Sequence, residues 1–415
     1  MNIIVFEDRH VERLHPITLG RPAYAISCGS YRLIDWLRTL DCPLSGLVRP
    51  HLTQLQELDY PDLGGNWEGR TGPLLMVNAR IVPSGAVFEN LKTILQTRRA
   101  GVVRSGDEVA AVLLSREADA LAQGVETANL ENYFEEIGIS RLEALECSLP
   151  LFEYPHDVIR NNQETLSQNL EYRLADGSYR EIDNGVFAAE GATIGQHVVT
   201  DVSKGPILLD ENAQIGPFSL LHGPAYVGRG SKLIEHAAIK DAVSIGHTAK
   251  IGGEVEASVI EPYTNKQHHG FLGHSYLGSW INLGAGTCNS DLKNTYGNVN
   301  IDYRGQRVAT DMQFVGCIMG DYAKTAINTG IFTGKVIGAC SMLYGFVTTN
   351  VPSFVNYARL FGQATEMSPE VMVATQRRMF QRRDVSQRPC DIQLMHDMYE
   401  LTREERQLAG EPLAL

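Results

Sequence analysis

A six-residue repeat runs through the middle of this chain and limits its fold more than any other feature. From Ala213 the sequence divides into seven consecutive hexads, AQIGPF through AKIGGE. The third place of each hexad is aliphatic: Ile215, Leu221, Val227, Leu233, Ile239, Ile245 and Ile251. Neither a helix, with a period of about 3.6, nor a single strand, with a period of about 2, produces such a repeat. The pattern predicts a left-handed parallel β-helix whose aliphatic residues point into a prism.

The repeat is interrupted twice and then resumes. The spacing of six returns in two later blocks: Phe271, Leu277 and Leu283, then Ile331, Ile337 and Leu343. Residues 253–270 and 288–311 lack the pattern. Segments that leave a solenoid become loops, and binding sites are often built on loops. We therefore expect two loops on the β-helix, with His268 and His269 where the first loop rejoins the repeat.

The regions on either side of the repeat predict two further domains. Apolar strand patterns over residues 1–6, 73–82 and 109–115 alternate with a strand edge that passes into a helix over residues 22–40 and with a helix pattern over residues 115–123. This order is typical of a sheet covered by helices. After Pro352 the repeat ends and two helix patterns follow. The predicted fold is an α/β nucleotidyltransferase-like (Rossmann-like) domain over residues 1–185, the β-helix over 186–352 and a C-terminal helical arm over 353–415.

Composition and charge exclude several kinds of partner. The net charge of −13 disfavours binding to nucleic acid or to an anionic membrane. The seven cysteines form no CxxC pair, which favours reduced thiols over disulfides or a zinc site. No apolar run approaches the roughly 20 residues that span a bilayer. Acidic residues follow the first short apolar run, unlike a signal peptide. We expect a cytoplasmic protein that binds neither nucleic acid nor membranes.

A motif in the β-helix resembles one known family. His268, Phe271, Leu272 and Gly273 precede the run from Asn282 to Thr287, NLGAGT. This spacing resembles the acetyltransferase half of the bifunctional UDP-N-acetylglucosamine pyrophosphorylase/glucosamine-1-phosphate N-acetyltransferase family, GlmU. The whole chain resembles a divergent group related to that family. The resemblance implies acyl transfer from acetyl-CoA to an amino-sugar 1-phosphate, in a homotrimer whose acyl-CoA pocket lies between neighbouring prisms.

The resemblance also assigns roles to individual residues of the β-helix. His268 takes the position of the acyl-transfer histidine, with His269 as the second choice. Three positions match the sugar-binding side of the family's site: Phe271 (a tyrosine in the family), Asn282 and Asn289. Ala285 matches a residue that lies beside acetyl-CoA in the family. Histidine titrates near neutral pH and so suits a general base that takes the proton of an attacking amine. Backbone N–H groups of the GAGT turn could stabilise the oxyanion.

The N-terminal region keeps only part of the sugar nucleotidyltransferase pattern. The frame Arg-Leu-x-Pro-Ile-Thr-x-x-x-Pro is present over residues 13–22. The family's glycines and lysine are replaced at four positions: Asp8, Arg9, Val11 and Ala23. Glycine lets backbone N–H groups approach a triphosphate closely, so these replacements alter the phosphate loop. The family's metal-binding Gly-Asp appears as Ala79–Arg80, where a cation replaces the carboxylate that would hold Mg²⁺.

Three interpretations of function remain open from the sequence. In the first, both halves are enzymes, UTP is a substrate, and its phosphates are held by arginines and a threonine: Arg13, Thr18, Arg21 and Arg80. In the second, the chain is a sugar-nucleotide-binding scaffold or regulatory protein without nucleotidyl transfer. In the third, β-helix histidines bind zinc as in gamma-class carbonic anhydrases, although their spacing matches no ligand pattern.

Overall fold

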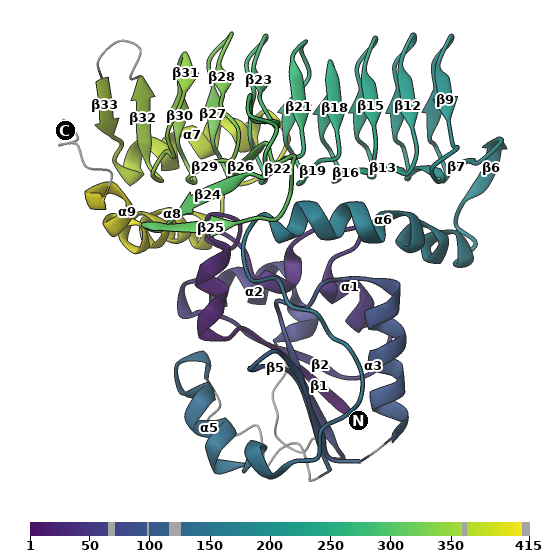
Figure 1. Cartoon of the computed structure of the whole chain (residues 1–415), viewed down its shortest axis with the longest axis vertical. Coiled ribbons are helices and arrows are strands. Elements are labelled where there is room, and N and C mark those ends of the chain that lie inside the picture. The colour runs from purple at the N-terminus through teal and green to yellow at the C-terminus, as the bar shows by residue number, and fades with distance from the viewer. Residues whose placement is uncertain (65–70, 98, 116–125, 359–362, 409–415) are drawn as a thin grey trace. The chain divides into compact units, whose positions relative to one another are not determined.

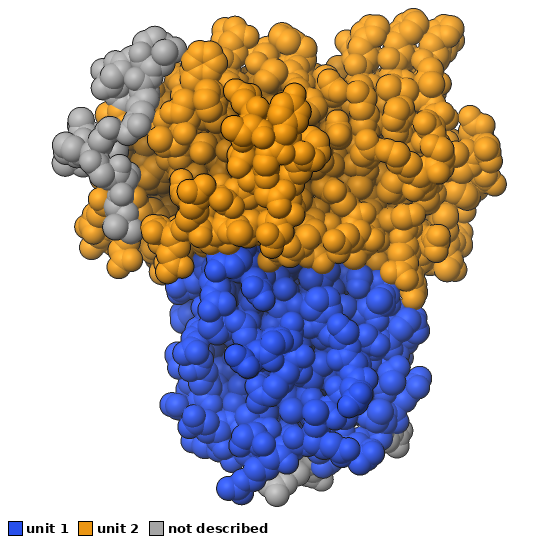
Figure 2. All heavy atoms as spheres, viewed as in Figure 1, with its two compact units in different colours: residues 1–14, 20–26, 31–154 blue, residues 15–19, 27–30, 155–415 orange. Residues whose placement is uncertain are grey.

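The chain folds into two compact units, which Figure 2 shows in different colours. The computed structural model describes residues 1–64, 71–97, 99–115, 126–358 and 363–408. Unit 1 comprises residues 1–14, 20–26 and 31–154, and unit 2 comprises residues 15–19, 27–30 and 155–415. The helix expected over residues 115–123 falls, beyond its first residue, outside the described residues.

Unit 1 is built on one mixed sheet with the strand order β2-β1-β3-β5-β4 (Figure 1). Its strands are β1 (Asn2–Phe6), β2 (Leu44–Leu47), β3 (Leu74–Asn78), β4 (Gly101–Ser105) and β5 (Glu108–Leu114). Its helices include the 3-10 turn η1 (Arg9–Leu14), α1 (Leu33–Arg38), α2 (Thr53–Asp59), α3 (Gly85–Thr97) and α5 (Leu130–Glu136). β1 is parallel to β2 and β3, whereas β5 is antiparallel to β3 and β4. β1 and β3 are buried along their whole length, which explains the apolar runs Ile3–Phe6 and Leu74–Val77 within them.

Unit 2 is a parallel β-helix whose described strands stack on three faces (Figure 1). Face 1 contains β7 (Val186–Ala188), β10 (Ile207–Leu209), β13 (Ala225–Val227), β16 (Val243–Ile245), β19 (Val259–Ile260), β22 (Tyr276–Leu277), β26 (Cys317–Met319) and β29 (Lys335–Ile337). Face 2 contains β8 (Thr193–Ile194), β11 (Gln214–Ile215), β14 (Lys232–Leu233), β17 (Lys250–Ile251), β20 (Asn265–Lys266), β27 (Lys324–Thr325), β30 (Met342–Leu343) and β32 (Val355–Ala358). Face 3 contains β9 (Val199–Asp201), β12 (Leu220–His222), β15 (Ala238–Lys240), β18 (Glu254–Glu256), β21 (Phe271–Gly273), β23 (Cys288–Asn289), β28 (Gly330–Ile331) and β31 (Phe346–Val347).

The predicted architecture, an α/β domain followed by a β-helix and helices, is confirmed. All seven aliphatic hexad residues are at most 3% exposed and belong to one apolar core inside the prism. The block from Ile331 to Leu343 supplies further residues to the same core. In the block before it, Leu272 and not Phe271 is the inward residue, because Leu272 is 2% exposed whereas Phe271 is half-buried. The predicted inward position in this hexad is therefore wrong by one residue.

Only the second of the two expected loops exists. Residues 253–270 form an ordinary coil with β18, β19 and β20, so that prediction was wrong. The hexad pattern does not extend through this coil, because its inward residues Val255 and Ile260 are five apart and the next inward position is Lys266. The second interruption leaves the three faces after β23. It forms the hairpin β24 (Asn300–Tyr303) and β25 (Gln306–Ala309), a separate sheet.

Helices cover parts of the β-helix. α6 (Asp157–Ala175) packs through Leu166 and Leu170 on Leu208 and Tyr226. β32 extends face 2 beyond Pro352, and β33 (Gln363–Glu366) pairs antiparallel with it. The expected C-terminal helices are present as α7 (Pro369–Gln381), α8 (Pro389–Leu401) and α9 (Arg403–Leu408). β6 (Arg180–Asp183) pairs antiparallel with β7. The domain limits at residues 185 and 352 stay predictions. The compact unit that contains the β-helix also contains α6, which precedes residue 185.

No described helix is long and apolar enough to cross a membrane.

Candidate functional site

The motif residues of the β-helix gather at the corner between faces 2 and 3. One coil places His268 and His269 at this corner, between β20 and β21. The next coil places the GAGT turn, Gly284 to Thr287, at the same corner. Gly286 N donates a hydrogen bond of 3.0 Å to His269 O, so the two turns stack directly. We call residues 267–270 and 284–287 together the histidine corner.

The two adjacent histidines have different surroundings. Both side chains are exposed. His268 Nε2 lies 3.4 Å from Gln267 Nε2. His269 Nε2 lies against the GAGT turn, because a side-chain carbon built at Gly286 would be 3.3 Å from it. The family position of the base is thus His268, whereas the ring that touches the expected oxyanion turn belongs to His269.

The other predicted residues of the β-helix divide into accessible and occupied positions. Asn282 is exposed on face 2, where it bridges Asn265 and Lys324 of the adjoining coils. Ala285 is half-buried within the GAGT turn. Phe271 is half-buried at the start of β21, and its N–H donates to Cys288 Sγ at 3.3 Å. These positions keep their predicted roles as proposals.

Asn289 is different because its side chain already has protein partners. It is 6% exposed. Its Oδ1 accepts from Gly273 N at 2.9 Å, and its Nδ2 donates to Gly273 O at 3.0 Å. A buried amide paired in this way holds two coils together. Its position does not support the sugar contact predicted for it.

From the sequence, His274 is interpreted as a structural histidine inside the coil rather than as the base. Its Nδ1 lies 2.8 Å from Asp291 Oδ2, and its ring stacks on Phe314 with centroids 5.1 Å apart. A carboxylate on one ring nitrogen fixes the orientation of an imidazole, as in many catalytic bases. The carboxylate lies 17 residues away in sequence. That separation gives no local pattern that would identify the pair.

A second candidate site is a cavity of about 680 Å³ in unit 1. It opens at the carboxyl end of β1, where Asp8 follows the strand and η1 begins. Ligands of open α/β sheets bind at this edge. Its wall is lined by Phe6, Asp8, Arg9, His10, Arg13, Asp107, Glu108, Val109, Thr127, Ala128, Leu130, Glu131 and Phe134. Four of these residues are carboxylates, against two arginines and one histidine, so the wall does not favour a free polyanion.

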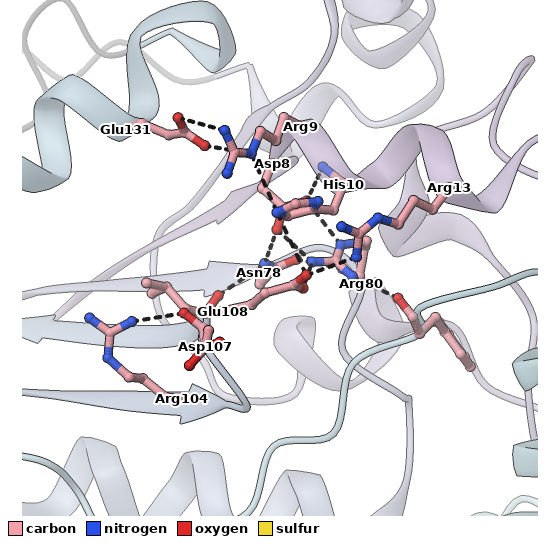
Figure 3. Close-up of polar contacts among 12 residues, drawn as sticks. Asp8, Arg9, His10, Arg13, Asn78, Arg80, Arg104, Asp107, Glu108 and Glu131 are labelled. Atoms are coloured by element: carbon pink, nitrogen blue, oxygen red, sulfur yellow. Dashed lines mark hydrogen bonds and ion pairs between the residues drawn. The ribbon is translucent and has the colours of Figure 1, made fainter.

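Arg80 lies beside this cavity as a buried cation (Figure 3). Its side chain is fully buried. Nε and Nη2 donate to the two oxygens of Asp8 at 2.9 and 2.6 Å, and Nη2 also donates to Glu108. Nη1 donates to Phe152 O at 2.7 Å. Burial alone would raise the pKa of Asp8, but the hydrogen bonds and charge of Arg80 hold that pKa below its usual value.

Two further residues complete this cluster. Asn78, at the end of β3, donates to Asp8 at 2.8 Å and accepts from Arg80 N at 3.0 Å. Arg13 Nη1 lies 3.1 Å from Glu108 Oε1. Two carboxylates therefore face two guanidinium groups, and the cluster is close to neutral without any added ion.

The magnesium ion that a nucleotidyltransferase fold implies does not fit these residues. Mg²⁺ is held by carboxylate and water oxygens in an octahedron. Here the guanidinium of Arg80 occupies the space between Asp8 and Glu108, and its positive charge would repel a second cation. Within the described residues, no group of three His, Cys, Asp or Glu side chains could hold a metal ion. The described residues of one chain therefore contain no set of side chains that would bind zinc as the third interpretation requires.

The structure separates the four residues predicted to hold phosphate. Arg13 lines the cavity and its side chain is 43% exposed. Arg80 is buried against carboxylates, and Thr18 is fully buried in unit 2. Arg21 is half-buried and is not part of the cavity wall. Of the four, only Arg13 is placed to meet a ligand in this cavity.

Two neighbours of Arg13 on η1, Arg9 and His10, also line the cavity. The sequence prediction omitted them because it treated Arg9 only as a lost glycine. Arg9 pairs with Glu131 at 2.8 Å, and His10 Nε2 lies 3.6 Å from Glu108 Oε1. The helical turn of η1 brings both side chains to the cavity.

Comparison with known proteins relates this chain to transferases. Residues 3–176 match the sugar nucleotidyl transferase family. The bifunctional sugar-1-phosphate nucleotidylyltransferase/acetyltransferase of Sulfurisphaera tokodaii is 24% identical over 382 residues, which cover 82% of this chain and 94% of that protein. The bifunctional protein GlmU of Thermotoga petrophila is 22% identical over 328 residues, 72% of this chain and 67% of its own.

A shorter match has higher identity. GlmU of a Picosynechococcus species is 33% identical over 166 residues, 40% of this chain and 28% of that protein. Among solved structures, the UDP-N-acetylglucosamine acyltransferase of Francisella novicida is 17% identical, with a TM-score of 0.32, and covers 56% of this chain and 79% of its own. The sequence matches span both halves of the chain. The chain is therefore a transferase that is similar to the GlmU-type bifunctional nucleotidylyltransferase/acetyltransferases, and its residues 3–176 match the sugar nucleotidyl transferase family.

Proposed function

We propose that the β-helix transfers an acyl group from acetyl-CoA to the amine of an amino-sugar 1-phosphate. The observation that carries this proposal is the histidine corner, where the turn that carries two exposed histidines stacks directly on the GAGT turn. Asn282 is exposed on the adjoining face and could contact the sugar. The acetyltransferase named in the Sulfurisphaera relative supports the same reaction class. Glucosamine 1-phosphate is the proposed acceptor.

Acyl transfer to an amine requires one general base and one group of N–H donors that stabilise the oxyanion. His268 takes a proton from the amine as the amine nitrogen attacks the thioester carbonyl carbon. The new C–N bond forms, charge develops on the carbonyl oxygen, and backbone N–H groups of the GAGT turn stabilise it. The C–S bond then breaks, and the proton held by the histidine passes to the departing thiolate. The products are the N-acyl sugar and free CoA, and no further reactant is needed.

The substrate contacts follow from the same corner. Phe271 gives the sugar side a ring without the hydroxyl that tyrosine would supply. Ala285 leaves room in the GAGT turn for the acyl group. One prism presents this corner to the outside, because both histidines and Asn282 are exposed. We infer that a homotrimer completes the acyl-CoA pocket.

The test is a thiol-release assay with acetyl-CoA and glucosamine 1-phosphate. We expect His268→Ala to lower kcat by about 10²–10⁴-fold, as removal of a general base does. His236→Ala is the matched control, since His236 lies at the equivalent corner two coils earlier, between β14 and β15. His236→Ala should keep the wild-type rate. Full activity in His268→Ala together with loss in His269→Ala would assign the base to His269. Full activity in both variants would refute the site.

A second candidate function belongs to unit 1. The match of residues 3–176 to sugar nucleotidyl transferases favours nucleotidyl transfer from UTP to a sugar 1-phosphate. The carboxylate-rich wall and the buried Arg80 oppose rapid turnover there. We therefore propose a reduced activity that depends on Arg13, with ligand binding alone as the alternative.

A further inference from the structure

Lys266 occupies an inward position of the β-helix that is filled by an apolar side chain in each of the three preceding coils. It is the last residue of β20, and its register partner in β17 is Ile251. Ile251 in turn pairs with Leu233, and Leu233 with Ile215, all members of the apolar core. Lys266 is 2% exposed. The chain thus places an ammonium group at an inward position.

The hydrogen bonds of this ammonium group all lead to turns of the chain. Lys266 Nζ donates to Gly252 O at 2.8 Å, to His268 O at 3.2 Å and to Gly270 O at 2.8 Å. An ammonium group has three N–H donors, so these contacts use all of them. Gly252 lies at the corner of the preceding coil. The ammonium group therefore ties the histidine corner to its neighbour from inside the prism.

Among the described contacts, His268 O accepts a hydrogen bond from Lys266 and from no second donor. Gly270 O also accepts from Glu254 N at 3.1 Å, and His269 O accepts from Gly286 N at 3.0 Å. For His268 O, Lys266 is the partner that the described contacts provide. Removing the ammonium group would leave Gly270 and His269 held and release the peptide that carries His268.

Stability does not explain a lysine at this position. A buried charge costs free energy unless it is paired with an opposite charge, and the hydrogen-bond acceptors here are neutral carbonyls. Burial lowers the pKa of Lys266 to about 8, with smaller opposing effects from Cys288 and Glu254. An apolar residue of similar volume would fill the same space without this cost. The reason for a lysine here is therefore sought in the backbone carbonyls that its ammonium group binds.

We propose that Lys266 is a positioning residue that fixes the backbone of His268 for acyl transfer. This inference rests on the proposed function of the histidine corner. Lys266 touches neither substrate nor reacting atoms; it acts through the carbonyl of His268. A general base must lie within hydrogen-bond distance of the proton it takes, and a displacement of about 1 Å costs roughly 10²-fold in rate.

Lys266→Met is the principal test, because methionine is unbranched, of similar length and carries no donor. We expect kcat to fall by about 10- to 100-fold, with KM for acetyl-CoA changed far less. The melting temperature should stay the same or rise, since a buried charge is replaced by an apolar chain. Leu233→Met is the matched control: it places the same residue at the same register position two coils earlier. It should keep kcat and lose a little stability.

Hydrogen exchange gives a readout that does not depend on catalysis. In Lys266→Met the amides of residues 267–269 should exchange faster than in the wild type, because the peptide that carries His268 is no longer held from inside the prism. If the wild type shows no acyl transfer, the proposed function fails and this measurement alone decides the positioning claim. Wild-type kcat or unchanged exchange in Lys266→Met would overturn it. Should that variant not fold, Lys266→Leu, which also lacks an N–H donor, is measured by the same two criteria.

Discussion

Arg80 and Asp8 form a two-point ion pair in which both carboxylate oxygens of Asp8 accept from one guanidinium group, at 2.9 and 2.6 Å. Glu108 shares the same nitrogen, Nη2. In a metal-dependent nucleotidyltransferase, carboxylates at such a site would bind a divalent cation. Here the cation belongs to the protein.

Arg80→Asp should turn this cluster into a metal site. The substitution removes the buried charge and adds a carboxylate near Asp8 and Glu108, so three carboxylates become available to one ion. We expect Mn²⁺ to bind this variant and to raise its melting temperature, which without metal falls because breaking a buried pair costs about 3–5 kcal/mol. Thermal denaturation and electron paramagnetic resonance with Mn²⁺ measure both effects.

The control for this experiment is Arg104→Asp. Arg104 is exposed on β4, and its Nη1 donates to Asp107 O at 3.0 Å, so the same change of charge occurs on the surface. That variant should gain no stoichiometric Mn²⁺ site. Equal Mn²⁺ binding by the wild type would show that Arg80 does not substitute for the metal.

Arg13→Ala tests nucleotidyl transfer in unit 1. Protein is incubated with UTP, Mg²⁺ and N-acetylglucosamine 1-phosphate while pyrophosphate release is followed. We expect slow release that the substitution abolishes, since Arg13 is the predicted phosphate ligand that lines the cavity. Arg104→Ala, a surface change in the same unit, should not alter the rate. Absence of release with measurable binding of the sugar phosphate would make unit 1 a binding domain.

The lowered pKa of Lys266 predicts how stability depends on pH. Its pKa is about 8 in the folded protein and ordinarily 10.5, so the unfolded chain binds more protons between these values. The free energy of unfolding therefore gains from this group as pH rises through that window, and the gain is lost as pH falls through 8. Relative to Lys266→Met, the wild type should gain about 2 kcal/mol between pH 7 and 9.5.

Urea denaturation at the two pH values measures this difference. Comparing wild type with variant cancels the titration of all other groups that the two proteins share. Lys232→Met, which removes an exposed lysine from face 2, is the control and should show no comparable change. A pH-independent difference between wild type and Lys266→Met would contradict the burial of a charged ammonium group.

A homotrimer is the assembly expected in solution. Light scattering should give three times the chain mass of 45.8 kDa at micromolar concentration. His268→Ala should assemble equally, because the side chain is exposed and takes no part in the core. A stable monomer with full acyltransferase activity would refute the inference that neighbouring prisms complete the pocket.

The sequence by itself determined the β-helix, because its information is periodic and local. An aliphatic residue at every sixth position can be buried in only a few ways, and Ile215 to Ile251 are buried as expected. Apolar runs likewise predicted β1 and β3. His268 and the GAGT run are both site residues predicted from the motif spacing, and they lie at one corner of the β-helix.

Tertiary structure decided what the individual side chains do. Arg80 meets Asp8 and Glu108 across 72 and 28 residues of sequence, and only the sheet brings them together. Lys266 reads as a polar interruption of the repeat, yet the coil turns it inward to hold His268. Asn289 matches a sugar ligand by position, but pairing across coils uses its amide. Such contacts depend on which distant residues become neighbours, and a pattern of spacing along one chain does not contain that information.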